Sequence, residues 1–300
     1  MLPRFAALLL LGLLLAACRG EQAVPTADDP AAAIRAQAQA LRDNDLARYA
    51  ELSLPPALYA GMERRWNEAA ASAAPVDALQ RAEFDEMLQR LTAKNAEVEL
   101  FRLYNKRMDT LEKEIAGQWP MLQATAGIFL KAAVDNNAEL DAEEKAHAQA
   151  SIAAVLAWVT PELLTDRERA RLAITELAAS ARQLELTSLE QTRQLNLQQA
   201  LAKGGIAMAG LKRVGRIYGF DADASLDALQ VEYLEGDEQR ARLRLRYPLL
   251  EQEIAVEIEM QRRDGGWYNA RTLREAEAEL AEPAVALELD TKSPSDVVTD

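Results

Sequence analysis

Apolar residues recur every third or fourth position through most of the first two hundred residues of the chain. The spacing is that of one face of an α-helix, and it runs from Ala31 to about Ala202. Phe84, Leu88 and Leu91 form one such stripe. Pro120 interrupts another stripe and is expected to stop or kink that helix, because proline lacks the backbone N–H that the helix needs. The pattern predicts an array of several helices.

Polar residues mark where several of these helices begin. Asp29 is placed to cap a helix whose first turn contains Pro30. Asp141 is expected to open a second helix in the same way. Two further helical segments are expected, one from Asp166 to Leu184 and one from Ser188 to Leu201.

The hydrophobic period changes to two in the last quarter of the chain. Between about residues 227 and 270, apolar residues alternate with arginine or glutamate, and turn residues separate the runs. This alternation predicts an antiparallel meander of three or four strands with one apolar face. Leu243, Leu245, Val256 and Ile258 are expected to be buried on that face. Something must cover it, and the preceding helices are the candidates.

The expected fold class is therefore mainly α with a small α+β part, in which a multi-helix array is followed by a three- to four-stranded antiparallel meander. We expect a helical domain over residues 31–205, a helix plus the sheet over 206–275, and an acidic, loose tail over 276–300.

The first eighteen residues have the pattern of an export signal. Arg4 precedes an apolar run from Phe5 to Leu15, which is shorter than the roughly 20 residues of a bilayer-spanning helix. The sequence Leu15-Ala16-Ala17-Cys18 then resembles the lipobox of bacterial lipoproteins. The resemblance implies a signal peptide over residues 1–17, a lipid on Cys18 and a flexible tether over 18–30.

Cysteine use and the residue after Cys18 extend this prediction. Cys18 is the only cysteine in 300 residues, so no disulfide can form within one chain. In the lipoprotein family, an aspartate after the lipidated cysteine retains the protein at the inner membrane. Arg19 stands there instead, which favours the outer membrane, with the protein facing the periplasm.

The charge of the chain excludes some partners. Its formal net charge is −14, and removal of the signal with Arg4 gives −14 − 1 = −15. Such a chain is unsuited to non-specific nucleic-acid binding, which needs basic surface. It is equally unsuited to broad adhesion to anionic lipid.

Two segments are similar to parts of the cone-shaped α+β fold shared by nuclear transport factor two and ketosteroid isomerase. They are the turn and strand over residues 264–268 and the helix end over residues 40–46. The resemblance implies that the helices between them are a large insertion. The family's catalytic Tyr and Asp have no counterparts that can be placed in this sequence, so no catalytic residue is carried over.

The sharpest charged feature is an arginine stripe made up of Arg240, Arg242, Arg244 and Arg246 on one expected strand. It has two interpretations. The stripe can bind an anionic ligand such as a lipid phosphate. Alternatively, it can pair with Glu253, Glu257 and Glu259 on the neighbouring strand, as opposite charges across strands commonly do.

Metal-ligand patterns are present but incomplete. Residues 221–232 place carboxylates at the spacing of a calcium loop, but Leu226 stands where that loop needs glycine. Residues 135–143 have the same defect at Leu140. Capping of a short helix by Asp223 explains the first segment, and the second also has Ala146 at the position of the last ligand, so we expect no metal and no cofactor.

Other catalytic patterns are equally incomplete. His147 is the only histidine, and its charged neighbours predict a solvated position on a helix. The segment from Gly205 to Lys212 resembles a phosphate loop, but Leu211 separates Gly210 from the lysine, so close helix packing is expected. The Glu-Ser pair of lytic transglycosylases does not occur in the chain.

These observations favour a non-enzymatic envelope lipoprotein, anchored in the membrane at Cys18, that binds a partner protein or a small ligand. The alternative is a carboxylate-dependent hydrolase or isomerase with a pocket between sheet and helices. A buried Asp or Glu with a raised pKa in such a pocket favours the enzyme. A large exposed apolar groove on the helices favours the binding protein.

Overall fold

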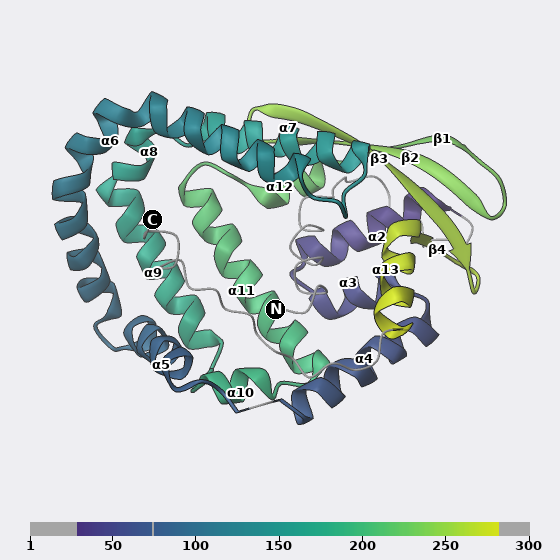
Figure 1. Cartoon of the computed structure of the whole chain (residues 1–300), viewed down its shortest axis with the longest axis horizontal. Helices are drawn as coiled ribbons and strands as arrows, with labels where there is room; N and C mark the ends of the chain where they lie inside the picture. The colour runs from purple at the N-terminus through teal and green to yellow at the C-terminus, as the bar shows by residue number, and fades with distance from the viewer. Residues whose placement is uncertain (1–28, 74, 282–300) are drawn as a thin grey trace.

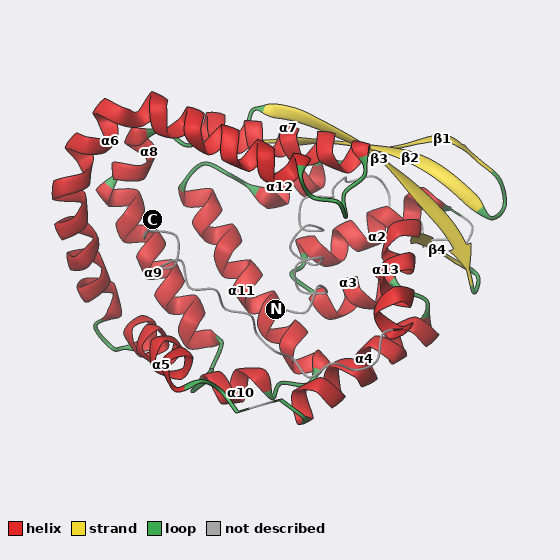
Figure 2. Cartoon of the chain, in the orientation of Figure 1, coloured by secondary structure: helices red, strands yellow, loops and turns green. Residues whose placement is uncertain are grey.

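A computed structural model describes residues 29–73 and 75–281 of the chain. Figure 2 shows that helices make up most of it, with one antiparallel sheet at one side, and the sheet is formed by residues 230–269 of the chain. The expected fold class, mainly α with a small α+β part, is confirmed. Cys18, the signal and most of the tether lie outside the described residues.

The first helix begins where its polar cap predicts. Helix α2 (Pro30–Arg42) starts after Asp29, whose carboxylate accepts a hydrogen bond from the Ala31 N–H at 2.9 Å. Asp45 caps helix α3 (Leu46–Ser53) in the same way, and helix α4 (Pro56–Ala71) follows with proline in its first turn.

The middle of the chain forms long outer helices (Figure 1). They are α5 (Ala78–Thr92), α6 (Ala96–Asp135), α7 (Ala142–Trp158) and the short α8 (Pro161–Thr165). Asp141 caps α7 in a reciprocal capping box, as expected.

Helix α6 is not interrupted at Pro120, where a stop or kink was expected. An internal proline removes one backbone hydrogen bond and costs about 3 kcal/mol, so the helix needs outside support there. Helix α7 packs along the second half of α6 and provides this support. The Gln123 side-chain amide of α6 donates a hydrogen bond to the Leu156 carbonyl of α7 at 2.5 Å. Figure 1 shows α6 changing direction along its length while remaining one helix.

Three further helices and one helical turn precede the sheet: α9 (Arg167–Gln183), α10 (Leu189–Arg193), α11 (Leu197–Ile217) and α12 (Ala222–Asp227). The single segment expected over Ser188–Leu201 is thus divided, because Asn196 caps a new helix with Gln199. Helix α11 also runs straight through residue 205, so the expected boundary there is not a break in secondary structure.

Strands β1 (Gln230–Gly236), β2 (Arg240–Leu249), β3 (Gln252–Arg263) and β4 (Gly266–Asn269) pair in chain order, each antiparallel to the next. The predicted meander is therefore confirmed. Helix α13 (Ala270–Ala281) follows the last strand, where the sequence predicts a short helix before the acidic tail.

The apolar face of this sheet forms the main core together with helices from distant parts of the chain. Leu243 and Leu245 are 0% exposed, Val256 is buried, and Ile258 is half-buried. Ile34 of α2 and Ala154 of α7 pack in the same cluster. The sheet and the helices thus share one core.

Helix α11 is held against the start of the fold by a glycine and a lysine. A Cβ atom on Gly205 would lie 2.3 Å from the Asn44 carbonyl oxygen, so only glycine allows this approach. Two turns later, the buried Lys212 Nζ donates to the Leu41 carbonyl at 2.7 Å and pairs with Asp223 at 2.7 Å. The ammonium group thus neutralises the carbonyl end of α2 and joins it to α11 and α12.

Replacing Lys212 tests how much this contact stabilises the fold. Lys212→Met keeps the aliphatic stem but leaves Asp223 and the carbonyl groups without their cation, and it should lower the free energy of unfolding by about 3 kcal/mol. The matched control is Arg216→Met, because Arg216 is 48% exposed and 3.9 Å from the same carboxylate. That change should cost under about 1 kcal/mol. Urea denaturation measures both, and equal losses would contradict the assignment.

Candidate functional site

The arginine stripe lies on the sheet face opposite the core, among glutamates of both neighbouring strands. Three of the four arginines form ion pairs: Arg244 with Glu257 at 2.6 Å, Arg246 with Glu232 at 2.9 Å, and Arg242 with Glu235 at 2.9 Å. Arg240 lies opposite Gln261. An anion would have to displace carboxylates from these guanidinium groups, so the geometry matches the pairing interpretation.

The partners differ in part from those expected. Glu257 pairs with the stripe as expected, whereas Glu253 lies opposite Pro248 in the sheet register. Glu232 and Glu235 come from β1, the strand on the other side. The alternating charges in the sequence suggested that the arginines would form ion pairs. The strand order shows that some of their partners are glutamates of β1.

His147 is not a solvated residue, and that expectation was wrong. It is half-buried, and its Nε2 lies 2.7 Å from the Tyr247 hydroxyl on β2. Burial lowers the pKa of His147 and raises the pKa of Tyr247 to about 12. The charged residues around His147 belong to the other faces of α7, while its own face packs on the sheet beside the buried Ser151.

The contacts of this cluster differ from those of an activated hydroxyl nucleophile. A hydroxyl whose pKa is about 12 is a poor nucleophile near neutral pH, and no carboxylate hydrogen bond to the imidazole is among the contacts of the described residues. The contact instead joins α7 to β2 at the edge of the main core.

The calcium-like segments do not converge on an ion. Asp221 caps α12, Asp223 pairs with Lys212, and Glu232 pairs with Arg246. In the other segment, Asp135 accepts from Lys131 and Gln149, and Asp141 caps α7. Within residues 29–73 and 75–281, no group of three or more His, Cys, Asp or Glu is arranged to hold a metal ion.

The phosphate-loop-like segment lies inside helix α11, where the backbone N–H groups serve the helix. Gly210 faces the Ser180 hydroxyl, which lies 2.2 Å from where a Cβ would be. Lys212 is engaged with α2 and Asp223. Close helix packing is thus the role of these residues.

The shifted carboxyl groups do not have the character of a general acid. In the described residues, the carboxyl groups whose pKa is displaced are all lowered: Glu97, Glu168, Glu190 and Asp237. The largest shift is that of Glu97, whose pKa is about 2 because the Arg182 guanidinium donates to both of its oxygens.

Arg182 also fixes the corner between α5 and α6. From α9, its guanidinium donates to the Ala93 carbonyl at 2.7 Å, just after α5, and to Glu97 in the first turn of α6. A rigid corner of this kind holds the two helices at a fixed separation.

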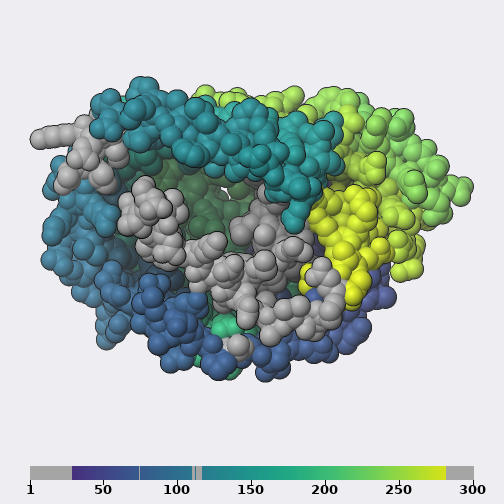
Figure 3. All heavy atoms as spheres, viewed as in Figure 1, coloured from purple at the N-terminus to yellow at the C-terminus, as the bar shows by residue number. Residues whose placement is uncertain are grey.

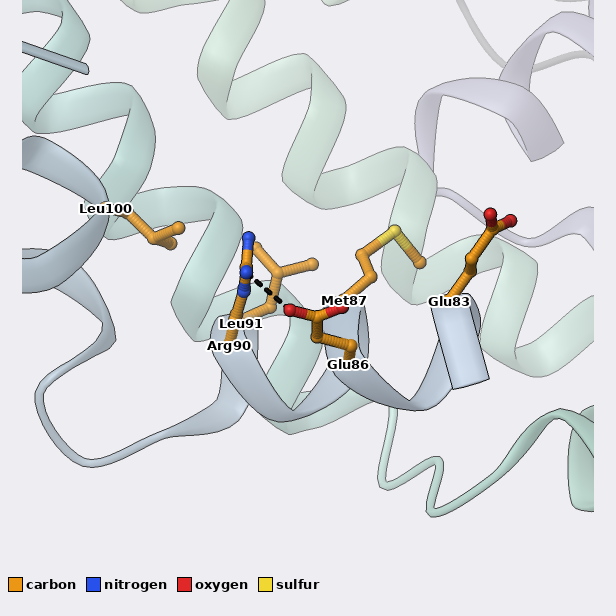
Figure 4. A pocket seen from close by; sticks show the side chains of 6 residues that line it. All are labelled: Glu83, Glu86, Met87, Arg90, Leu91 and Leu100. Carbon is orange, nitrogen blue, oxygen red and sulfur yellow. Dashed lines mark hydrogen bonds and ion pairs between the residues drawn. The ribbon is translucent and has the colours of Figure 1, made fainter. Parts of the chain in front are cut away.

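A shallow depression of about 370 Å³ lies between these two helices (Figure 4). Its lining residues are Glu83, Glu86, Met87, Arg90 and Leu91 of α5 and Leu100 of α6. Arg90 and Glu86 form an ion pair across one helical turn at 2.5 Å. Met87 lies beside this pair, and 51% of its surface is exposed. Leu79, in the first turn of α5, is 67% exposed.

The second half of α6 carries a more pronounced apolar feature. Met121, Leu122, Ile128, Phe129 and Leu130, here called the apolar ridge, are between 42% and 71% exposed. Residues 115–130 contain no charged side chain, although 27% of the chain is charged. Figure 3 shows the α6–α7 pair along one edge of the molecule. The sequence predicted helix through this region but did not indicate that these apolar side chains stay uncovered.

Comparison of the chain with protein-family models, with curated proteins and with solved structures finds no match. None of the helices in the described ranges combines the length and the hydropathy of a membrane span.

The single histidine allows a direct test of the α7–sheet contact. Because the folded state lowers the pKa of His147, the unfolded state binds the proton first as pH falls below about 6.5. The free energy of unfolding is therefore unaffected by His147 above about pH 6.5 and decreases as the pH falls below it. Between pH 6.5 and 5.5 the loss should be at most about 1.4 kcal/mol.

The measurement compares urea denaturation of the wild type and His147→Gln across this pH range, and the difference isolates the histidine from the many carboxylates. A proton NMR titration of the one imidazole gives its pKa directly. A value at or above 6.5 would contradict the buried contact with Tyr247.

Proposed function

We propose that the chain is a bacterial envelope lipoprotein, anchored in the outer membrane by a lipid on Cys18 and facing the periplasm. Its helical array is a non-enzymatic binding module for a partner protein or a small ligand, and it uses no cofactor. The observation that carries this proposal is the apolar surface left exposed on helices α5 and α6.

The physical argument is the cost of exposed apolar area. Soluble proteins seldom leave large contiguous apolar patches uncovered, and those that remain commonly mark binding sites. The depression between α5 and α6 has the volume of a small ligand site but is shallow, which suits a partner's side chain seated beside Met87. The Arg182 contacts hold its walls in place before binding, so little ordering is needed.

The proposed anchor fits the start of the fold. Ten residues, 19–28, separate Cys18 from Asp29, the cap of the first helix. An extended segment of that length spans at most about 35 Å. The folded part would therefore stay close to the membrane while the tether leaves it free to turn.

The alternative of a hydrolase or isomerase has less support. At the interface between sheet and helices, Tyr247 contacts His147 and Ser151. The carboxyl groups of the described residues whose pKa is displaced lie elsewhere, and each pKa is lowered, whereas a carboxylic general acid near neutral pH needs a raised pKa.

Removing the thiol tests the anchor. Cys18→Ser should abolish acylation, because the hydroxyl cannot replace the sulfur in the lipid-transfer step, and should leave uncleaved precursor or released protein. Mass spectrometry of the mature N-terminus and fractionation of envelopes measure this outcome. A cut elsewhere, with Cys18 unmodified in the wild type, would show that the chain is not a lipoprotein.

A charge placed in the depression tests the binding surface. Met87→Glu should reduce recovery of the bound partner from solubilised envelopes by tenfold or more, because burying the carboxylate against an apolar side chain is costly. Tyr233→Glu is the matched control, since Tyr233 is 53% exposed, close to the 51% of Met87, but lies on β1. Thermal melting checks that both variants fold.

Quantitative mass spectrometry of the recovered proteins decides the result. The proposal predicts a protein or ligand that is retained by the wild type and by Tyr233→Glu and lost from Met87→Glu. A recovered set that is identical for all three would place the binding surface elsewhere.

A further inference from the structure

The apolar ridge stands out from the helices around it. Ile128, Phe129 and Leu130 are consecutive and so point about 100° apart around the helix, yet they are 70%, 71% and 43% exposed. A helix lying in a groove exposes one side, whereas this stretch of α6 exposes most of its circumference. The feature is therefore a protrusion and not a cleft.

Its shape and area narrow what can cover it. A free acyl chain needs an enclosed apolar site, which a protrusion does not provide. Five large apolar side chains exposed by 42–71% form a patch on the scale of the functional patches of soluble proteins, roughly 300–600 Å². A stable dimer buries about 800 Å² on each partner, so the ridge is too small to be the interface with a second copy.

The charge of the chain further limits which kinds of partner can cover the apolar ridge. With a net charge of −14, most of the surface is repelled by an anionic bilayer. Residues 115–130 are uncharged, so this is a place where the chain can meet lipid without burying a charge. Lys131, at the end of the ridge, is already paired with Asp135 at 2.8 Å.

The path of the chain connects the ridge to the proposed anchor. Helix α7 follows α6, and its first turn carries Glu144, which pairs with Arg271 at the start of α13. Strand β4 leads directly into α13 and packs against α2, the first helix after the tether. Figure 1 shows the α6–α7 pair reaching toward α2 and α13. The proposed anchor is thus connected through α2, β4, α13 and α7 to the helix that carries the apolar ridge.

We propose that the apolar ridge is a membrane-contact surface. It enters the boundary between headgroups and acyl chains of the bilayer that carries the anchor, so that the folded part lies on the membrane with α6 against it. This inference rests on the proposed lipid anchor. It assigns the depression between α5 and α6 to the soluble partner and the apolar ridge to lipid.

The test imposes the anchor chemically. A chain that begins at Cys18 retains all residues of the described fold, and its single thiol can be coupled to maleimide lipid in phosphatidylcholine vesicles. Phe129→Trp places a fluorophore on the apolar ridge, and Tyr233→Trp places one on β1 with 53% exposure in the parent residue. Brominated acyl chains then quench only an indole that reaches the acyl region.

We expect the tryptophan at position 129 to be quenched at least twofold more than the one at position 233, after subtraction of the wild-type signal. Ile128→Asp in the Phe129→Trp chain should remove the difference. Adding anionic lipid should weaken the contact and adding salt should restore it, because the acidic chain is repelled. A basic surface would respond in the opposite way.

Three outcomes would overturn the proposal: equal quenching at both positions, quenching at position 129 that needs an added envelope protein, and loss of the exposed site through self-association in analytical ultracentrifugation. The coupling to lipid is artificial, so failure of natural acylation at Cys18 does not affect this result. The anchor and the membrane contact can therefore fail independently.

Discussion

The sheet has one apolar face, and the need to cover it organises the rest of the molecule. Leu243 and Leu245 are fully buried, and a shift of the register by one residue would turn both to the charged side. Helix α2 from the start of the chain and α7 from its middle close over this face. Because α6 packs along α7, the position of the outer helices also follows from the sheet.

The sequence predicts local structure well where one side chain decides it. Asp141 and Asp166 each cap the helix that was expected to follow, because their carboxylates accept from backbone N–H groups three residues on. Pro120 does not stop α6, because packing against α7 supports the helix there, and no local pattern in the sequence records that support. The expected single helix over Ser188–Leu201 failed because Asn196 begins a new helix within it.

The candidate site is less predictable, because periodicity identifies an apolar face but not what covers it. Phe129 and Leu243 are both apolar residues in periodic segments, yet one is 71% exposed and the other 0%. His147 shows the same limit for a polar residue: its neighbours in sequence are charged, and its neighbour in space is Tyr247, one hundred residues away. The ion pairs of the arginine stripe were easier to predict, because arginines and glutamates alternate along two successive strands. In the sheet, Glu257 lies directly opposite Arg244.

Helix α6 combines two surfaces with opposite requirements. Its first half is rich in charge and is fixed by ion pairs from α9, where Arg182 binds Glu97 and Arg167 binds Asp109 at 3.0 Å. Its second half has no charge over residues 115–130 and is fixed by packing against α7. One helix can bury only part of its circumference against one neighbour, so an apolar segment that packs along α7 leaves other faces open. The apolar ridge is that remainder, and the acidity of the rest of the chain provides the solubility that such an exposed surface requires.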